Sequence, residues 1–124
     1  MNTEEELEEL KKYLIKLRSL INHDAIFSFN NKKIIDKKRI DDILCCVQAS
    51  IPKEYTNYVK RHNDKVLKTE FCYLELIKAI KNKFLFCNNV YLVYQTEALS
   101  KIENLLLAVS SDIKYINQQE KMNK

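Results

Sequence analysis

The chain has 124 residues, 46% of them hydrophobic, with no glycine, a single proline and a formal net charge of +4. Glycine supplies the positive φ angles of tight turns and the backbone of phosphate-binding loops. Without it the chain cannot contain a Walker loop, a GxGxxG turn or a GxSxG nucleophile elbow, and the enzyme classes built on those motifs are excluded.

A first helix is predicted over residues 3–22. Its apolar positions repeat at alternating steps of three and four, which is the spacing of a helix face turned toward a core. These positions are Leu7, Leu10, Leu14, Leu17 and Ile21. No apolar run reaches the roughly 20 residues that cross a bilayer. The chain also starts with acidic residues, unlike a secretory signal. We therefore expect a cytoplasmic protein without a membrane partner.

A connection over residues 23–35 precedes a second helix over 36–50, for which Asp36 is the expected N-cap. Phe27 and Phe29 allow either an irregular connection packed on the helices or a short strand. Ser50-Ile51-Pro52 then has the pattern of a helix start, because proline is favoured in the first turn.

The third helix is predicted over 53–84, with the polar stretch 60–65 either as an exposed face of a continuous helix or as a break. Residues 84–94 are ambiguous between a loop and a strand, since Val90–Tyr94 is β-branched and aromatic. Thr96 is expected to cap a last helix that reaches Asn117. The polar residues 118–124 are expected to fray.

Together these patterns predict one all-α domain over residues 1–124, a four-helix bundle with a short irregular or strand-like connection near 84–94. Apolar rows left over on the third helix, with Phe27, Phe29, Tyr91 and Tyr94, indicate a further contact with another chain, so a homo-oligomer or a protein partner is expected.

The four cysteines do not form a CxxC pair, and Cys45 and Cys46 are adjacent. We interpret them as core thiols, with a metal site or a disulfide as the alternatives. No arrangement of serine, cysteine, histidine and carboxylate has the pattern of a catalytic triad. We expect no cofactor, no metal and no enzymatic activity.

Two groups of basic residues predict a surface that contacts phosphates. Lysine acts there as a point charge, so such a surface tolerates many sequences. The alternative is a solvated, lysine-rich exterior that reflects an AT-rich genome. The first group is Lys32, Lys33, Lys37, Lys38 and Arg39, and the second, on the third helix, is Lys60, Arg61, Lys65 and Lys68.

Arg18 and His23 are spaced as in the R-x4-H motif, which resembles the ribonuclease motif of the all-helical HEPN domains. That resemblance implies His23 as a general base or acid and Arg18 as a group that stabilises charge on a phosphodiester. The alternative is that His23 ends a helix, where its cationic form suits the helix dipole, and that Arg18 is a surface residue.

The segment from Ile40 to Asn117 has an amphipathic helix, then Ile51-Pro52-Lys53, a long helix and a last helix ending in Ile113-Lys114-Tyr115-Ile116. In this order it resembles two related groups of helical-bundle proteins. They are the accessory variability determinant of diversity-generating retroelements and the proteins encoded in ribosomal RNA intervening sequences. The resemblance to the retroelement group implies a basic, oligomeric bundle that assists a reverse transcriptase and contacts nucleic acid.

The leading hypothesis is therefore a non-enzymatic helical module that contacts nucleic acid or a nucleoprotein partner through its lysine-rich face. A protein–protein adaptor or oligomer subunit, including a viral or phage antagonist protein, is the second hypothesis. A HEPN-like ribonuclease is the third.

Overall fold

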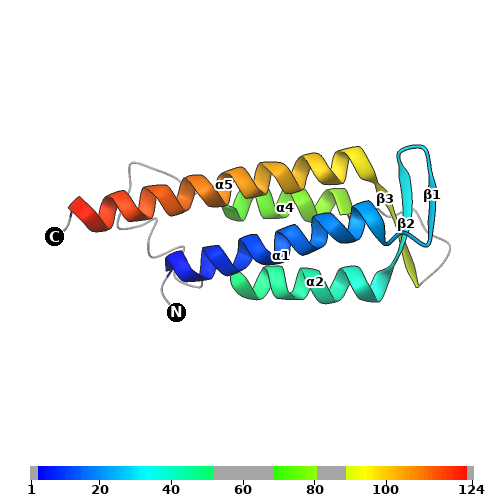
Figure 1. The fold of residues 1–124 in the computed structure, drawn as a ribbon, viewed down its shortest axis with the longest axis horizontal. Coiled ribbons are helices and arrows are strands. Elements are labelled where there is room, and N and C mark those ends of the chain that lie inside the picture. The colour runs from blue at the N-terminus through cyan, green and yellow to red at the C-terminus, as the bar shows by residue number, and fades with distance from the viewer. Residues whose placement is uncertain (1–2, 52–68, 81–88, 123–124) are drawn as a thin grey trace.

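The computed structural model describes residues 3–51, 69–80 and 89–122. The helices lie alongside one another, and a small sheet stands across one end of them (Figure 1). In chain order the elements are α1 (Thr3–His23), β1 (Phe27–Phe29), β2 (Lys32–Asp36), α2 (Lys37–Ser50), α4 (Thr69–Ile80), β3 (Val90–Tyr94) and α5 (Gln95–Met122).

The expectation of an all-α four-helix bundle is wrong, because the fold is mixed α/β. Three strands pair antiparallel in the order β1-β2-β3. Phe29 lies opposite Lys32 in the β1–β2 hairpin, and Lys32 lies opposite Tyr94 in the β2–β3 pair. Both segments that were ambiguous in the sequence, 27–29 and 90–94, are strands.

The hairpin forms without glycine because asparagine takes the glycine position. Asn30 has a φ of 54°, the left-handed region that asparagine tolerates better than most residues. With Asn31 it makes the two-residue connection between β1 and β2. The absence of glycine therefore excludes glycine-dependent loops, but it does not exclude a hairpin.

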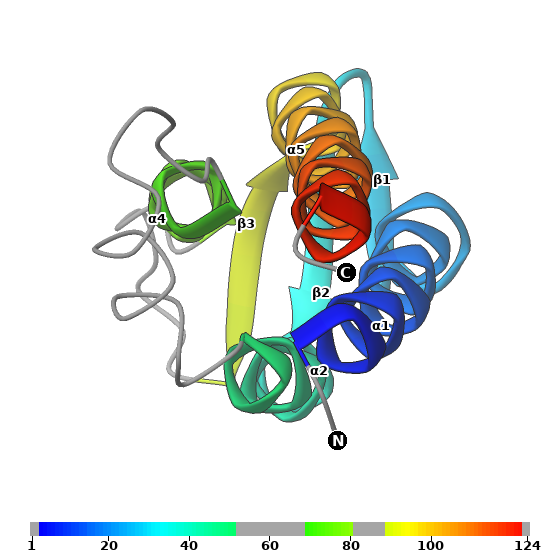
Figure 2. The same ribbon diagram turned by 90° about the vertical axis from the view of Figure 1, so that its left-hand side faces the viewer.

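The helices share one apolar core whose members the helical spacing predicts well. Every residue of the predicted first-helix seam is fully buried, and α1 packs on both α2 and α5, while α4 packs on α5. Figure 2, which looks along the helices, shows this arrangement. From the inner face of the sheet Ile35 and Val93 join the core, both fully buried, so the sheet closes one end of the bundle.

Asn31, not Thr96, provides the capping oxygen at the start of α5. Its side-chain Oδ1 accepts hydrogen bonds from the Thr96 backbone N at 2.7 Å and from Thr96 Oγ1 at 2.6 Å. Its backbone oxygen accepts from the Gln95 N at 2.7 Å. The expected role of Thr96 as N-cap is wrong, because its hydroxyl is a donor here. The hairpin turn and the last helix are thus fastened together.

The second helix is confirmed, with Asp36 as its N-cap through a bond from the Lys38 N. Of the predicted third helix, only the part in α4 lies within the described residues, and the question about 60–65 falls outside them. Leu76 and Ile80 of α4 are buried, whereas Leu74, expected in a second apolar row, is 55% exposed. The last helix continues to Met122 and so includes most of the polar tail that was expected to fray.

The interpretation of the cysteines as core thiols is wrong for two of them. Cys45 and Cys46 are exposed, because the core positions of α2 are Ile40, Leu44 and Val47. Cys72 is partly buried and packs against the core. Cys45 and Cys46 are free thiols, and the fourth cysteine lies outside the described residues. Within the described part of the chain, none of the helices has the length and apolarity needed to cross a membrane.

Candidate nucleic-acid interface

Only the first of the two predicted basic groups lies within the described residues. Lys32, Lys33, Lys37, Lys38 and Arg39 occupy β2 and the first turn of α2, which follow each other without a loop. They gather at the end of the molecule where the sheet stands (Figure 1). The second group, Lys60, Arg61, Lys65 and Lys68, lies outside the described residues.

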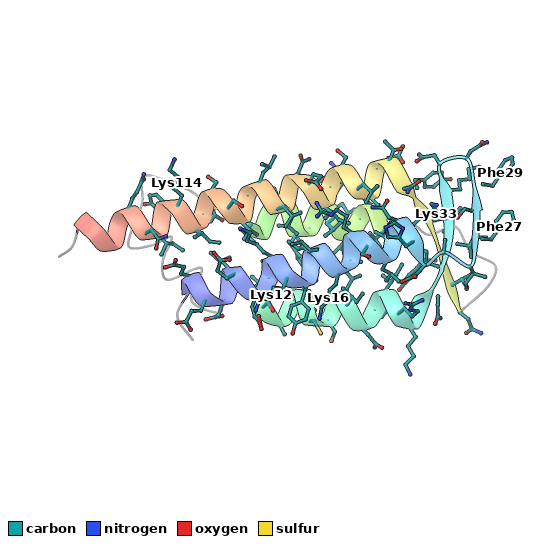
Figure 3. The ribbon with its side chains drawn as sticks, in the orientation of Figure 1. Lys12, Lys16, Phe27, Phe29, Lys33 and Lys114 are labelled. Carbon is teal, nitrogen blue, oxygen red and sulfur yellow. The ribbon has the colours of Figure 1, made fainter. Side chains whose placement is uncertain are left out.

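The alternation of β2 divides its two lysines between the two faces of the sheet. Lys33 shares the inner face with the buried Ile35, and its Nζ donates to Ser28 Oγ of β1 at 3.1 Å. Lys32 is exposed on the outer face, which points away from the helices. Figure 3 shows Lys33 on the bundle side of the sheet and Phe27 and Phe29 on the opposite side. The Lys33 ammonium is thus already engaged in a hydrogen bond within the sheet, on the face that packs against the helices.

Two lysines of the group lie over tyrosine rings of β3. The Lys32 Nζ is 6.0 Å from the centre of the Tyr94 ring, and the Lys37 Nζ is 5.9 Å from that of Tyr91. Such cation–π contacts hold an ammonium in place while leaving it accessible to water and to an anion. From the sequence, both tyrosines stand out only as surplus aromatic residues. The sequence left their segment ambiguous between a loop and a strand, and its pairing with β2 requires the tertiary structure.

The first turn of α2 contains Lys37, Lys38 and Arg39 and no acidic residue. The helix macrodipole places partial positive charge at this end, so three cations here oppose it. Arg39 forms a solvent-exposed ion pair with Asp24, in which its Nη2 lies 3.0 Å from Asp24 Oδ2. The Lys38 ammonium has no hydrogen-bond or ion-pair partner among the described residues.

Acidic residues also lie at this end, and their oxygens accept hydrogen bonds within the protein. Asp36 caps α2, Asp24 pairs with Arg39, and Glu97 Oε2 accepts from the Asn31 side chain at 2.9 Å. Asp41 Oδ1 accepts from the Tyr91 hydroxyl at 2.9 Å. Of these four carboxylates only Asp24 is paired with a cation within the described part of the chain, and the other three keep their negative charge beside the basic group. Lys32 and Lys38 form no ion pair with an acid among the described residues.

The Tyr91–Asp41 bond joins β3 to α2 beneath Lys37. Burial and, after it, the hydrogen bond and charge of Asp41 raise the pKa of Tyr91 to about 12. The phenol therefore remains protonated and remains a donor through the physiological range. Deeper between the helices, burial raises the pKa of Tyr73 on α4, and the nearby Cys45 adds a smaller contribution.

The outer face of the sheet carries exposed aromatic residues that the predicted site did not include. Phe27 is 58% exposed and Phe29 is 62% exposed, although β1 is paired with β2. Ile34 and Leu92 lie beside Phe27 on the same face and are partly buried. The sequence left Phe27 and Phe29 open between an irregular connection and a short strand, and only the sheet places them on one face beside Lys32.

Among the described residues, Arg18 and His23 do not come together in one site. Arg18 Nη1 is 2.6 Å from Glu103 Oε1 of α5, an ion pair between two helices. His23 is the last residue of α1 and is exposed, as in the alternative interpretation of the motif. Five residues along a helix correspond to a rotation of about 140°, so the two side chains start from different faces.

Over the described ranges 3–51, 69–80 and 89–122, no group of three or more histidine, cysteine, aspartate or glutamate side chains is arranged to hold a metal ion. Comparison of the chain with known protein families, with curated proteins and with solved structures finds no match. The resemblance to retroelement and intervening-sequence bundle proteins therefore remains an expectation from the sequence.

Proposed function

We propose that this protein binds nucleic acid, alone or in a nucleoprotein partner, through the basic end formed by Lys32, Lys37, Lys38 and Arg39, without catalysing a reaction. The predicted second group, Lys60, Arg61, Lys65 and Lys68, belongs to the same proposal. Lysines bind phosphates largely through charge, and the release of counterions from the nucleic acid supplies the affinity.

The observation that supports this proposal is the charge of the first turn of α2. A helix usually has acidic residues there, since cations near its N-terminus cost a few tenths of a kcal/mol to about 1 kcal/mol each. Two lysines and an arginine occupy the turn instead. Features that oppose local stability are expected where they contribute to function, and an anion bound at this turn would offset the repulsion.

A fluorescence-anisotropy titration tests the proposal. Labelled single strands and duplexes of about 12 nucleotides or base pairs are titrated at roughly 50 and 200 mM salt, and binding should weaken steeply with salt. The double variant Lys37→Gln/Lys38→Gln should make the negative slope of log K against log salt less steep, by about 1.4 on single strands or 1.8 on duplexes. The same variant should differ little in stability, because relief of the repulsion with the dipole offsets the loss of the Lys37 contact with the Tyr91 ring.

The matched control is Lys12→Gln/Lys114→Gln, two exposed lysines on α1 and α5 away from the sheet (Figure 3). It removes the same formal charge, so it separates a localised interface from overall basicity. Equal losses in the two double variants would contradict the localised interface. No binding of the wild-type chain to any probe at low salt would contradict the function itself.

The exposed apolar side chains support a second candidate, an adaptor or oligomer subunit. Phe27 and Phe29 on the sheet and Leu107 on α5, which is 69% exposed, are the type of residue that protein interfaces bury. This function predicts an oligomer or a stable complex that persists at high salt. Light scattering at roughly 50 mM and 1 M salt distinguishes it from the first candidate, whose binding is salt-sensitive.

A further inference from the structure

The outer face of the sheet combines aromatic rings and a cation in one ordered row. Phe29, Lys32 and Tyr94 lie opposite one another across the three strands, and Phe27 starts the next row with Ile34. Side chains opposite one another in antiparallel strands share a face and lie close together. The two phenylalanines are exposed, whereas Tyr94 has the Lys32 ammonium over its ring.

We propose, building on the nucleic-acid function above, that this face binds single-stranded nucleic acid. Two unpaired bases stack on Phe27 and Phe29, and Lys32, held by Tyr94, contacts the phosphate between them. Unpaired bases expose their aromatic faces, and stacking on protein rings is insensitive to sequence. In a duplex the bases are already stacked on each other, so the two rings gain nothing from it.

The position of Lys32 favours this occupant over a second copy of the chain. Two copies packed by this face would bring the Lys32 ammonium groups together and bury them, with Asp36 as the only acid of each outer face, and burying charged groups is costly. The other charged residue of the face, Asp36, is engaged as the cap of α2. A strand of nucleic acid supplies both the aromatic rings that match the phenylalanines and the negative charge that matches Lys32.

The continuation into α2 extends the path for the phosphates. β2 passes directly into the first turn of α2, where the Lys38 ammonium has no acidic partner among the described residues. The aromatic face would hold the bases, and the basic turn would hold the adjoining backbone. This division matches the arrangement of single-strand binders, in which aromatic platforms lie along a positively charged track.

The test compares Phe27→Leu/Phe29→Leu with Phe27→Tyr/Phe29→Tyr. Leucine keeps an apolar side chain but removes the ring, while tyrosine keeps the ring. Binding of a labelled deoxythymidine or uridine strand of about 12 nucleotides is measured by anisotropy, with a duplex of equal length beside it. The leucine variant should bind the single strand roughly 5- to 150-fold more weakly per lost stack, and the tyrosine variant should bind as the wild type does.

Lys32→Gln provides the charge arm of the test, and Lys16→Gln is its matched control. Lys16 is also an exposed lysine over a tyrosine ring, with its Nζ 5.4 Å from the Tyr13 ring centre, but it lies on α1. Lys32→Gln should make the negative slope of log K against log salt less steep for the single strand, by about 0.7. Lys16→Gln should leave this slope unchanged.

Equal binding of the single strand by the leucine variant and the wild type would overturn this inference while leaving the basic interface intact. A wild-type preference for duplex would have the same result. Light scattering of the same samples tests whether a second copy of the chain binds to this face instead. A salt-resistant dimer that the tyrosine variant loses, with no single-strand binding, would assign the face to a second copy. Absence of binding to every probe would overturn the nucleic-acid function as well.

Discussion

At the scale of single residues, two adjacent asparagines take the positions that glycine and a helix-capping residue often occupy in other proteins. Asn30 adopts the left-handed backbone of the hairpin, and Asn31 fastens the hairpin to the start of α5. The side chain of Asn31 also donates to Glu97 at 2.9 Å. One turn residue therefore connects β1, β2 and the last helix.

Replacing Asn31 by alanine should destabilise the protein by about 1–2 kcal/mol, the usual cost of losing a helix cap. The Thr96 N–H and hydroxyl would lose their shared acceptor, and water would replace it only in part. Urea denaturation followed by circular dichroism measures the change. Asn31→Asp keeps the acceptor for Thr96 but loses the donor to Glu97 and places two carboxylates side by side, so it should recover only part of the loss. An alanine variant as stable as the wild type would show that solvent caps α5 equally well.

The raised pKa of Tyr91 predicts that the free energy of unfolding decreases at alkaline pH. Its pKa is raised from 10.0 to about 12 in the folded chain by burial and by Asp41. Between those values the unfolded chain releases the phenolic proton while the folded chain retains it. The contribution of Tyr91 is therefore complete below pH 10 and is lost as pH rises toward 12.

Tyr91→Phe should remove this part of the pH dependence. Denaturation at a series of pH values from 9 to 12, and the absorbance of tyrosinate, measure it. Other tyrosines and the lysines also titrate in this range, so the difference between variant and wild type is the informative quantity. If the two curves stay parallel, the Tyr91–Asp41 bond does not persist in solution.

At the scale of elements, α4 is joined to α5 by a buried polar contact as well as by apolar packing. Asp112 Oδ2 accepts from the Thr69 backbone N at 3.1 Å and from Thr69 Oγ1 at 2.7 Å. Asp112 is 3% exposed and Thr69 is fully buried. Buried polar groups need such partners, because a buried donor without an acceptor costs free energy.

Asp112→Ala should destabilise the protein by about 1–3 kcal/mol or more, since it leaves the two Thr69 donors without this acceptor. Asp112→Asn retains an acceptor oxygen and should recover part of the loss. The free energy of unfolding in urea and the protection of α4 amides against hydrogen exchange report the effect. Equal stability of the alanine variant and the wild type would contradict the proposed link.

At the scale of the whole molecule, one core holds the helices and the sheet together, and neighbouring leucines of α5 test it. Leu105 is fully buried and Leu107 is 69% exposed. Leu105→Ala should cost about 2–5 kcal/mol, because it removes apolar contacts and leaves a cavity. Leu107→Ala should change the stability by no more than about 0.5 kcal/mol. Thermal denaturation of the two variants gives the comparison, and similar effects would contradict the assignment of the core.

Local periodicity predicted most of the helical core and part of the candidate site. The leucines of α1 repeat at helical steps, so their burial follows from the sequence, as does the cap at Asp36. Leu105 and Leu76 were not among the predicted seam positions, although both are fully buried. Helical spacing identifies a face, but its width depends on how many neighbours the helix has.

The sequence by itself determined most of the residues that form the main helices and the dense basic run that continues into the first turn of α2, because helical spacing and charge are local properties. Only the tertiary structure decided that 27–29, 32–36 and 90–94 form a sheet. Strand pairing depends on partners far apart in the chain, and short apolar runs do not reveal them. The same pairing places Phe29, Lys32 and Tyr94 in one row, so the proposed binding face exists only once the chain has folded.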